Sequence, residues 1–185
     1  GISYAVFVTT LTGTKENEIT TGTISMSFVE KNDGISITNA VPMSNSVGKK
    51  LDGAGNVYDF VVSSTIAGIT TVNYEVVAEK IPFVDYEHLS DENIRIYLQK
   101  YEDGKYIDVP ITSTPSKFIP NDQESILGSP ADGMILYEGS FENNTAEKKS
   151  FNDYFRLRMW VSDNTILDNI IRKYKLKINV YGKVL

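Results

Sequence analysis

The chain has 185 residues, a formal net charge of −6, no cysteine and one histidine. Its length suits a single domain, and its acidic balance disfavours nucleic-acid binding, because phosphate recognition usually needs a basic face. The absence of cysteine from the sequence excludes disulfides and thiolate chemistry, and no apolar run approaches the roughly 20 residues that span a bilayer.

An apolar segment, residues 1–8, opens the sequence (GISYAVFV). Alternate positions from Ile2 to Val8 form one apolar face, and Ala5 and Phe7 give the other face apolar character, so a strand here expects burial on both sides. A strand at the start of a chain either pairs within its own sheet or completes the sheet of another molecule, and both alternatives stay open. The glycine start, without an initiator Met, is typical of a processed chain. The residues expected at an assembly interface are Ile2, Tyr4, Ala5, Val6, Phe7 and Val8.

Beyond this segment the dominant hydrophobic period is two, which predicts strands. Two turns with an Asp-Gly pair, Asn32-Asp33-Gly34 and Asp103-Gly104, predict hairpins, because glycine takes a positive φ without steric cost. A short helix is predicted over residues 164–172, with Ser162 or Asp163 as its cap. The predicted strands cover residues 23–29, 35–38, 57–64, 71–79, 94–100, 106–109, 134–141, 154–161 and 174–181.

This pattern of about ten short strands separated by turn residues predicts an all-β fold. We expect an antiparallel jelly roll or β-sandwich with a short helix and irregular insertions. Residues 110–130 hold four of the six prolines and predict an irregular connection. Aromatic residues within the alternating strands are interpreted as core rather than as a sugar-binding platform. They are Tyr58, Tyr74, Tyr97, Tyr154 and Trp160.

Motifs for catalysis and for metal binding are not recognisable in the sequence. Hydrolytic triads and histidine-ligated zinc sites depend on histidine, and His88, in a polar loop, is interpreted as a surface residue. The acidic stretches 85–92 and 121–124 offer oxygens to calcium but lack the EF-hand spacing, so we interpret them as solvated loops. Asn143-Asn144-Thr145 is a glycosylation sequon. The sequence therefore predicts no catalytic residue, no metal ligand and no cofactor.

Two stretches of the N-terminal half carry a resemblance to a known family. Ala5-Val6-Phe7, followed after a polar spacer by residues 17–26 (NEITTGTISM), resembles the start of mature TasA and camelysin-like proteins. The stretches 37–42 and 58–63 and the strand at 154–161 extend the resemblance, whereas residues 81–153 have no counterpart. The resemblance implies a jelly roll, secretion with removal of a signal peptide, and fibres in which one subunit's N-terminal strand enters a groove in the next. The metallopeptidase activity described for camelysin-like members is not carried over, because no zinc site is recognisable.

On this basis residues 1–12 are a candidate donor strand, and residues 13–185 form one β-sandwich domain with an insertion at about 81–153. The expected function is that of a self-assembling, non-enzymatic protein of extracellular surface or biofilm-matrix fibres. Its expected partners are copies of itself, with no nucleic acid and no membrane in the mature form. Two alternatives remain: a secreted, peptidase-like hydrolase with an unrecognised site, and a module that binds carbohydrate or another surface.

Overall fold

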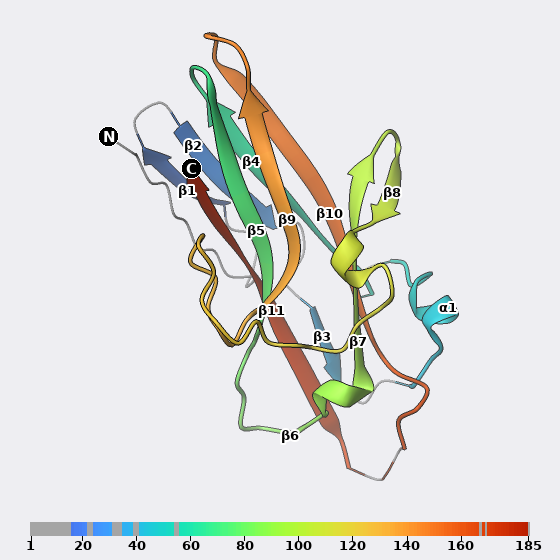
Figure 1. The fold of residues 1–185 in the computed structure, drawn as a ribbon. Coiled ribbons are helices and arrows are strands. Elements are labelled where there is room, and N and C mark those ends of the chain that lie inside the picture. The colour runs from blue at the N-terminus through green and yellow to red at the C-terminus, as the bar shows by residue number, and fades with distance from the viewer. Residues whose placement is uncertain are drawn as a thin grey trace.

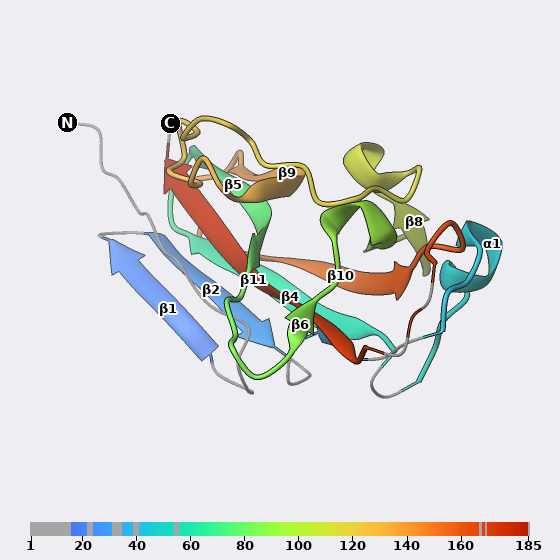
Figure 2. The ribbon, with the colours of Figure 1, turned by 90° about the horizontal axis from the view of Figure 1, so that it is seen from below.

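The computed structural model describes residues 16–21, 24–30, 35–38, 41–53, 56–166, 168 and 170–184. Within these residues the chain forms an antiparallel β-sandwich of jelly-roll type, so the predicted fold class is confirmed. Figure 1 shows the long strands running side by side, and Figure 2 shows the two sheets as separate layers. The segment of residues 1–8 lies outside the described residues.

One sheet has six strands and the other has five. The six-stranded sheet has the order β1 (Glu16–Thr21), β2 (Ile24–Glu30), β4 (Tyr58–Ile66), β10 (Lys149–Val161), β7 (Ile94–Glu102) and β8 (Lys105–Asp108). The five-stranded sheet has the order β3 (Ile35–Thr38), β11 (Arg172–Val184), β5 (Thr70–Lys80) and β9 (Met134–Asn143), and β6 (Glu87–His88) pairs with β11. The β6–β11 pair is parallel, and the other pairs of these strands are antiparallel. Three short helical turns are described: α1 (Asn45–Gly48), η1 (Asp91–Asn93) and η2 (Pro110–Thr112).

The core fills the space between the two sheets, and it follows the predicted alternation. On β10 every second side chain enters the core, namely Phe155, Leu157, Met159 and Val161. The interpretation of the strand aromatics as core residues is confirmed for four of the five. These four are buried: Tyr58, Tyr74, Tyr97 and Trp160. Tyr154 differs, because its side chain is 41% exposed.

The two predicted hairpins have different outcomes. Glu102 lies opposite Lys105 across the β7–β8 turn, and positive φ angles at Asp103 (50°) and Gly104 (83°) give the primed turn that suits a tight hairpin. The hairpin expected between 23–29 and 35–38 is wrong. Both edges of β2 are already paired, with β1 and with β4, so β3 joins β11 in the other sheet.

The helix predicted over residues 164–172 is also wrong for the residues described there. Ser162 does accept a hydrogen bond from the Asn164 N–H (3.3 Å), as a cap would, but the turn does not continue into a helix. The apolar stripe that suggested a helix has nothing to pack against, since Ile166 is 94% exposed. Without burial, so short a helix is not stable, and the chain enters β11 at Arg172 instead.

Residues 81–153 supply β6 to β9 and the first residues of β10 to the sandwich. Within the six-stranded sheet, β7 lies between β10 and β8, and it buries Ile94, Ile96 and Leu98 in the core. β9 pairs with β5 along most of its length and buries Leu136 and Phe141. This segment is therefore part of the core, and its status as an insertion relative to the resembled family stays a prediction.

Candidate functional site

The two edges of β11 differ in how they are paired. One edge pairs with β5 from Leu176 to Val184. The other edge pairs with β3 only from Lys173 to Leu176. From Lys177 to Val184, no strand of the described part of the chain lies on this second edge, which we call the open edge of β11.

The direction of the backbone groups along β11 follows from one hydrogen bond. The N–H of Ile81 donates to the carbonyl of Lys175 (3.1 Å), so Lys175 turns its backbone groups toward the β5 side. Alternate residues of an antiparallel strand turn them to opposite sides. Ile178 and Val180 are fully buried, and buried N–H and C=O groups require partners. The open edge thus needs a partner that the described strands do not supply. The residues whose backbone groups point to it are Ile178, Val180, Gly182 and Val184.

The residues expected at the assembly interface are not placed by the structure. Ile2, Tyr4, Ala5, Val6, Phe7 and Val8 all lie outside the described residues. The structure instead shows an edge of β11 beside which no described strand lies, and sequence reasoning missed this edge. The missing signal is long-range, because it depends on the pairing of β3 with only four residues of β11, beyond which no strand among the described residues lies on that edge.

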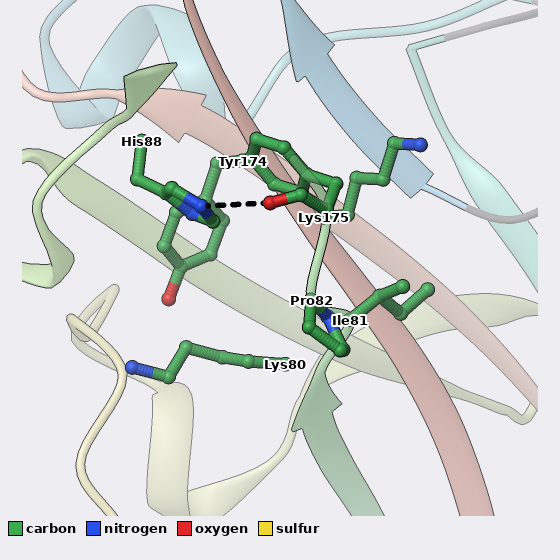
Figure 3. A pocket seen from close by; sticks show the side chains of 7 residues that line it. Lys80, Ile81, Pro82, His88, Tyr174 and Lys175 are labelled. Atoms are coloured by element: carbon green, nitrogen blue, oxygen red, sulfur yellow. Dashed lines mark hydrogen bonds between the residues drawn. The ribbon is translucent and has the colours of Figure 1, made fainter. Parts of the chain in front are cut away.

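A pocket lies where the C-terminal end of β5 meets β6 and the start of β11 (Figure 3). It encloses about 240 Å³ and is lined mostly by apolar surface from Lys80 to Phe83, His88, Tyr174 and Lys175. β5 ends here because Pro82 has no N–H to continue the ladder. The sequence predicts a strand that ends at residue 79, but not that the segment after it folds against β11.

His88 forms one wall of this pocket. Its ring stacks on the ring of Phe83, with centroids 4.0 Å apart and an interplanar angle of 19°. Its Nε2–H donates to the Phe83 carbonyl (3.2 Å), since a carbonyl only accepts. His88 is exposed, as expected from its polar surroundings in the sequence. Both contacts of the His88 ring are therefore with Phe83, five residues earlier, and they hold this segment in a turn. Among the described residues, no hydroxyl or carboxylate forms a hydrogen bond with the ring.

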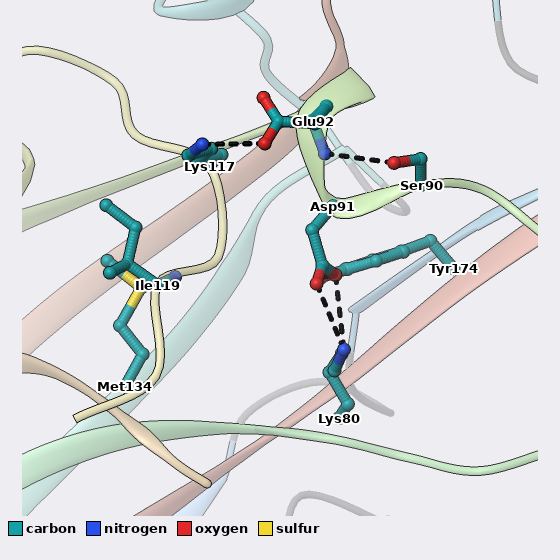
Figure 4. Close-up of polar contacts among 8 residues, drawn as sticks. All are labelled: Lys80, Ser90, Asp91, Glu92, Lys117, Ile119, Met134 and Tyr174. Atoms are coloured by element: carbon teal, nitrogen blue, oxygen red, sulfur yellow. Dashed lines mark hydrogen bonds and ion pairs between the residues drawn. The ribbon is translucent and has the colours of Figure 1, made fainter. Parts of the chain in front are cut away.

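Asp91, at the start of η1, connects three elements beside the pocket (Figure 4). It accepts a hydrogen bond from the Tyr174 hydroxyl on β11 (2.7 Å) and pairs with the Lys80 ammonium at the end of β5 (3.1 Å). Its neighbour Glu92 pairs with Lys117 (2.6 Å). These contacts hold η1 against both the sheet and the connection to β9.

Three of the residues weighed as calcium ligands lie beside lysines in the same region. Asp91 and Glu92 face lysines, and Asp85 lies 3.8 Å from the Lys173 ammonium. Within the described ranges, no group of three or more His, Asp or Glu side chains could hold a metal ion. Also within these ranges, no helix is long and apolar enough to cross a membrane.

Buried tyrosines beside carboxylates predict a loss of stability at alkaline pH. Burial, and then the hydrogen bond to Asp91, raise the pKa of Tyr174, and burial with the Asp153 carboxylate raises the pKa of Tyr74. The unfolded chain loses these protons near pH 10 while the folded chain keeps them, so their contribution is complete below about pH 10 and is lost above it. Above about pH 10, each such tyrosine should steepen the fall of the free energy of unfolding by about 1.4 kcal/mol per pH unit.

Urea unfolding between pH 8 and 11, followed by the fluorescence of Trp160, checks this expectation. Tyr174→Phe should make the fall above pH 10 shallower, whereas Tyr101→Phe, at a residue that is 45% exposed, should leave it as in the natural chain. If the free energy of unfolding falls equally steeply above about pH 10 in the two variants, Tyr174 does not contribute to the alkaline loss of stability.

Comparisons with known proteins reveal only distant likenesses. No family model matches the chain, and no curated protein matches it. One similar solved structure is the VP2 subviral particle of infectious bursal disease virus, with 10% identity over 98% of this chain and a TM-score of 0.34. The chain spans 32% of the length of that VP2 chain. Another is TmCBM61 solved in complex with β-1,4-galactotriose, with 7% identity, a TM-score of 0.28, and coverage of 85% of this chain and 86% of that one. We draw no function from these two structures.

Proposed function

We propose that this chain is a non-enzymatic structural protein that assembles with copies of itself outside the cell. In this proposal, residues 2–8 of one copy pair with the open edge of β11 in the next copy. The observation that supports it is the open edge itself, where Ile178 and Val180 are buried while their outward backbone groups lack a described partner strand. An added strand would supply those hydrogen bonds, as in other cases of strand addition to a sheet edge.

The donor and acceptor segments match in length and in character. The stretch from Lys177 to Val184 is about 26 Å long at about 3.3 Å per residue, and residues 1–8 have the same length as a strand. A strand added to this edge extends the five-stranded sheet, so one of its faces would turn toward the six-stranded sheet, where apolar side chains are buried. Burying its four alternate side chains contributes roughly 6–12 kcal/mol before the loss of chain entropy. This burial offsets part of the cost of ordering the segment and of bringing two copies together.

The geometry of such a contact leads to a filament. The donor segment and the acceptor edge are different surfaces of the same chain, so each copy offers one of each. A head-to-tail contact of this kind does not close on itself unless the rotation between copies forms a ring. Copies would therefore add one after another, and the growing end would always present an open edge of β11.

A synthetic peptide of residues 1–10 tests the proposal by acting as a chain terminator. We expect the purified chain to form filaments that are visible by electron microscopy and that shorten as the molar excess of peptide rises. A peptide of the same composition in scrambled order is the matched control and should leave filament length unchanged. A chain that stays monomeric at all concentrations, or filaments that are indifferent to the peptide, would contradict the proposal.

A further inference from the structure

The pocket between β5, β6 and β11 has an unusual balance of charge for this chain. The whole sequence carries a formal net charge of −6, yet the pocket's lining includes two lysines and a histidine and no acidic residue. The remaining lining is apolar or aromatic, supplied by Ile81, Pro82, Phe83 and the ring of Tyr174. Such a lining complements an anion that also carries an apolar body.

The two lysines differ in whether their charge is already compensated. The Lys80 ammonium lies 3.1 Å from Asp91 Oδ2, so this charge is paired. Lys175 makes no ion pair with any residue in the described part of the chain, and its ammonium lies 5.7 Å from the centre of the Phe83 ring. Figure 3 shows the two lysine side chains pointing in opposite directions, with the Lys175 ammonium directed away from His88 and Tyr174. The lysine without an ion pair is thus Lys175, and its ammonium lies near the ring of Phe83.

The size and polarity of the pocket narrow the choice of ligand further. A volume of about 240 Å³ exceeds the roughly 150 Å³ of a cavity known to admit benzene, so a single six-membered ring with one substituent fits. Mostly apolar walls offer few partners for the hydroxyl groups of a sugar, which would then be desolvated without hydrogen bonds. An aromatic ring suits the stacked pair of Phe83 and His88 better.

We propose that this pocket binds an aromatic carboxylate, with the ring against Pro82 and Phe83 and the carboxylate paired with Lys175. Lysine reaches such a partner readily, because its long stem carries a compact charge that can reorient at little cost when no ion pair holds it. Two sources share this chemistry: a small aromatic acid, and the C-terminal carboxylate of a peptide that ends in an aromatic residue. The proposal is independent of self-assembly, because the pocket lies beyond the open edge, at the β3 end of β11.

The only histidine of the sequence provides a clean signal for binding. In NMR titrations of the full chain, kept below the concentration at which filaments form, benzoate and N-acetylphenylalanine should shift the ring signals of His88 to saturation. Benzamide and N-acetylphenylalanine amide, which keep the ring and lose the charge, should bind at least about tenfold more weakly. Tighter binding of benzoate would assign the pocket to small acids, and tighter binding of N-acetylphenylalanine would assign it to peptide termini.

A matched pair of variants on β11 tests the role assigned to Lys175. Lys175→Gln should weaken benzoate binding about tenfold, whereas Lys177→Gln, at a lysine of the same strand outside the pocket, should leave it unchanged. Both variants should keep the circular dichroism of the natural chain. The proposal fails if His88 shows no saturable shift at millimolar benzoate, if benzamide binds as well as benzoate, or if the two variants bind equally.

Discussion

Val6→Asp should abolish self-assembly at concentrations where the natural chain forms filaments, while the sandwich itself stays folded. Val6 lies in the middle of the apolar donor segment. On a strand that extends the five-stranded sheet, the side chain of Val6 would turn toward the core and be buried, and an unpaired carboxylate there costs several kcal/mol in lost hydration. Because about 1.4 kcal/mol corresponds to a factor of ten in affinity, the concentration needed for assembly should rise at least about a hundredfold.

Sedimentation and negative-stain electron microscopy across a concentration series measure this change. Thr9→Asp is the matched control, because it adds the same charge just after the apolar run and should assemble nearly as the natural chain does. Circular dichroism and urea unfolding of both variants report on the domain. Filaments of Val6→Asp at the natural concentration would refute donor-strand assembly. Unfolding of the Val6→Asp monomer would show instead that the segment packs within its own domain.

Asn143→Ala should lower the free energy of unfolding by about 3 kcal/mol. Asn143 is fully buried at the end of β9, and both ends of its amide are used. Its Nδ2 donates to the carbonyls of Ile66 (2.9 Å) and Glu147 (2.8 Å), and its Oδ1 accepts from the Thr145 N–H (3.0 Å) and hydroxyl (3.0 Å). Alanine would leave several buried polar groups without partners, and that loss dominates the expected effect.

Asn144→Ala provides the control for the same turn, because Asn144 is exposed and should change the stability by less than about 0.5 kcal/mol. Urea unfolding followed by the fluorescence of Trp160 gives both values. A loss below about 1 kcal/mol for Asn143→Ala would contradict the importance of the buried amide. This burial also bears on the glycosylation sequon, because Asn143, the residue to which a glycan would be attached, is fully buried in the folded chain.

Local chemistry explains which parts of the fold could be predicted from sequence. The β7–β8 hairpin follows from Asp103-Gly104, since these two residues adopt the positive φ angles that the turn requires. The inward face of β10 follows from strict alternation between residues 155 and 161. Both features depend on neighbours within a few positions, so the sequence is sufficient to predict them.

Long-range pairing explains where prediction failed. The sequence around Asp33-Gly34 carries a similar turn signal, yet β2 and β3 enter different sheets because β4 and β11, far along the chain, are their partners. The pocket could not be foreseen for the same reason, since Pro82 and Lys175 meet only through the pairing of β5 and β6 with β11. The spacing of Ile166, Ile170 and Ile171 predicts a helix, but Ile166 is 94% exposed and the other two are about half exposed, so no buried face supports a helix there.

Residue-resolved amide hydrogen exchange along β11 tests the assembly proposal most directly. The amides of Ile178, Val180 and Gly182 point to the open edge, and those of Asn179 and Tyr181 point to β5. We predict that the first three become strongly protected only when filaments form, while the other two are protected in both dispersed and assembled chains. If the first three are equally protected in dilute monomers, or still exchange freely in filaments, a neighbouring copy does not provide a strand beside β11.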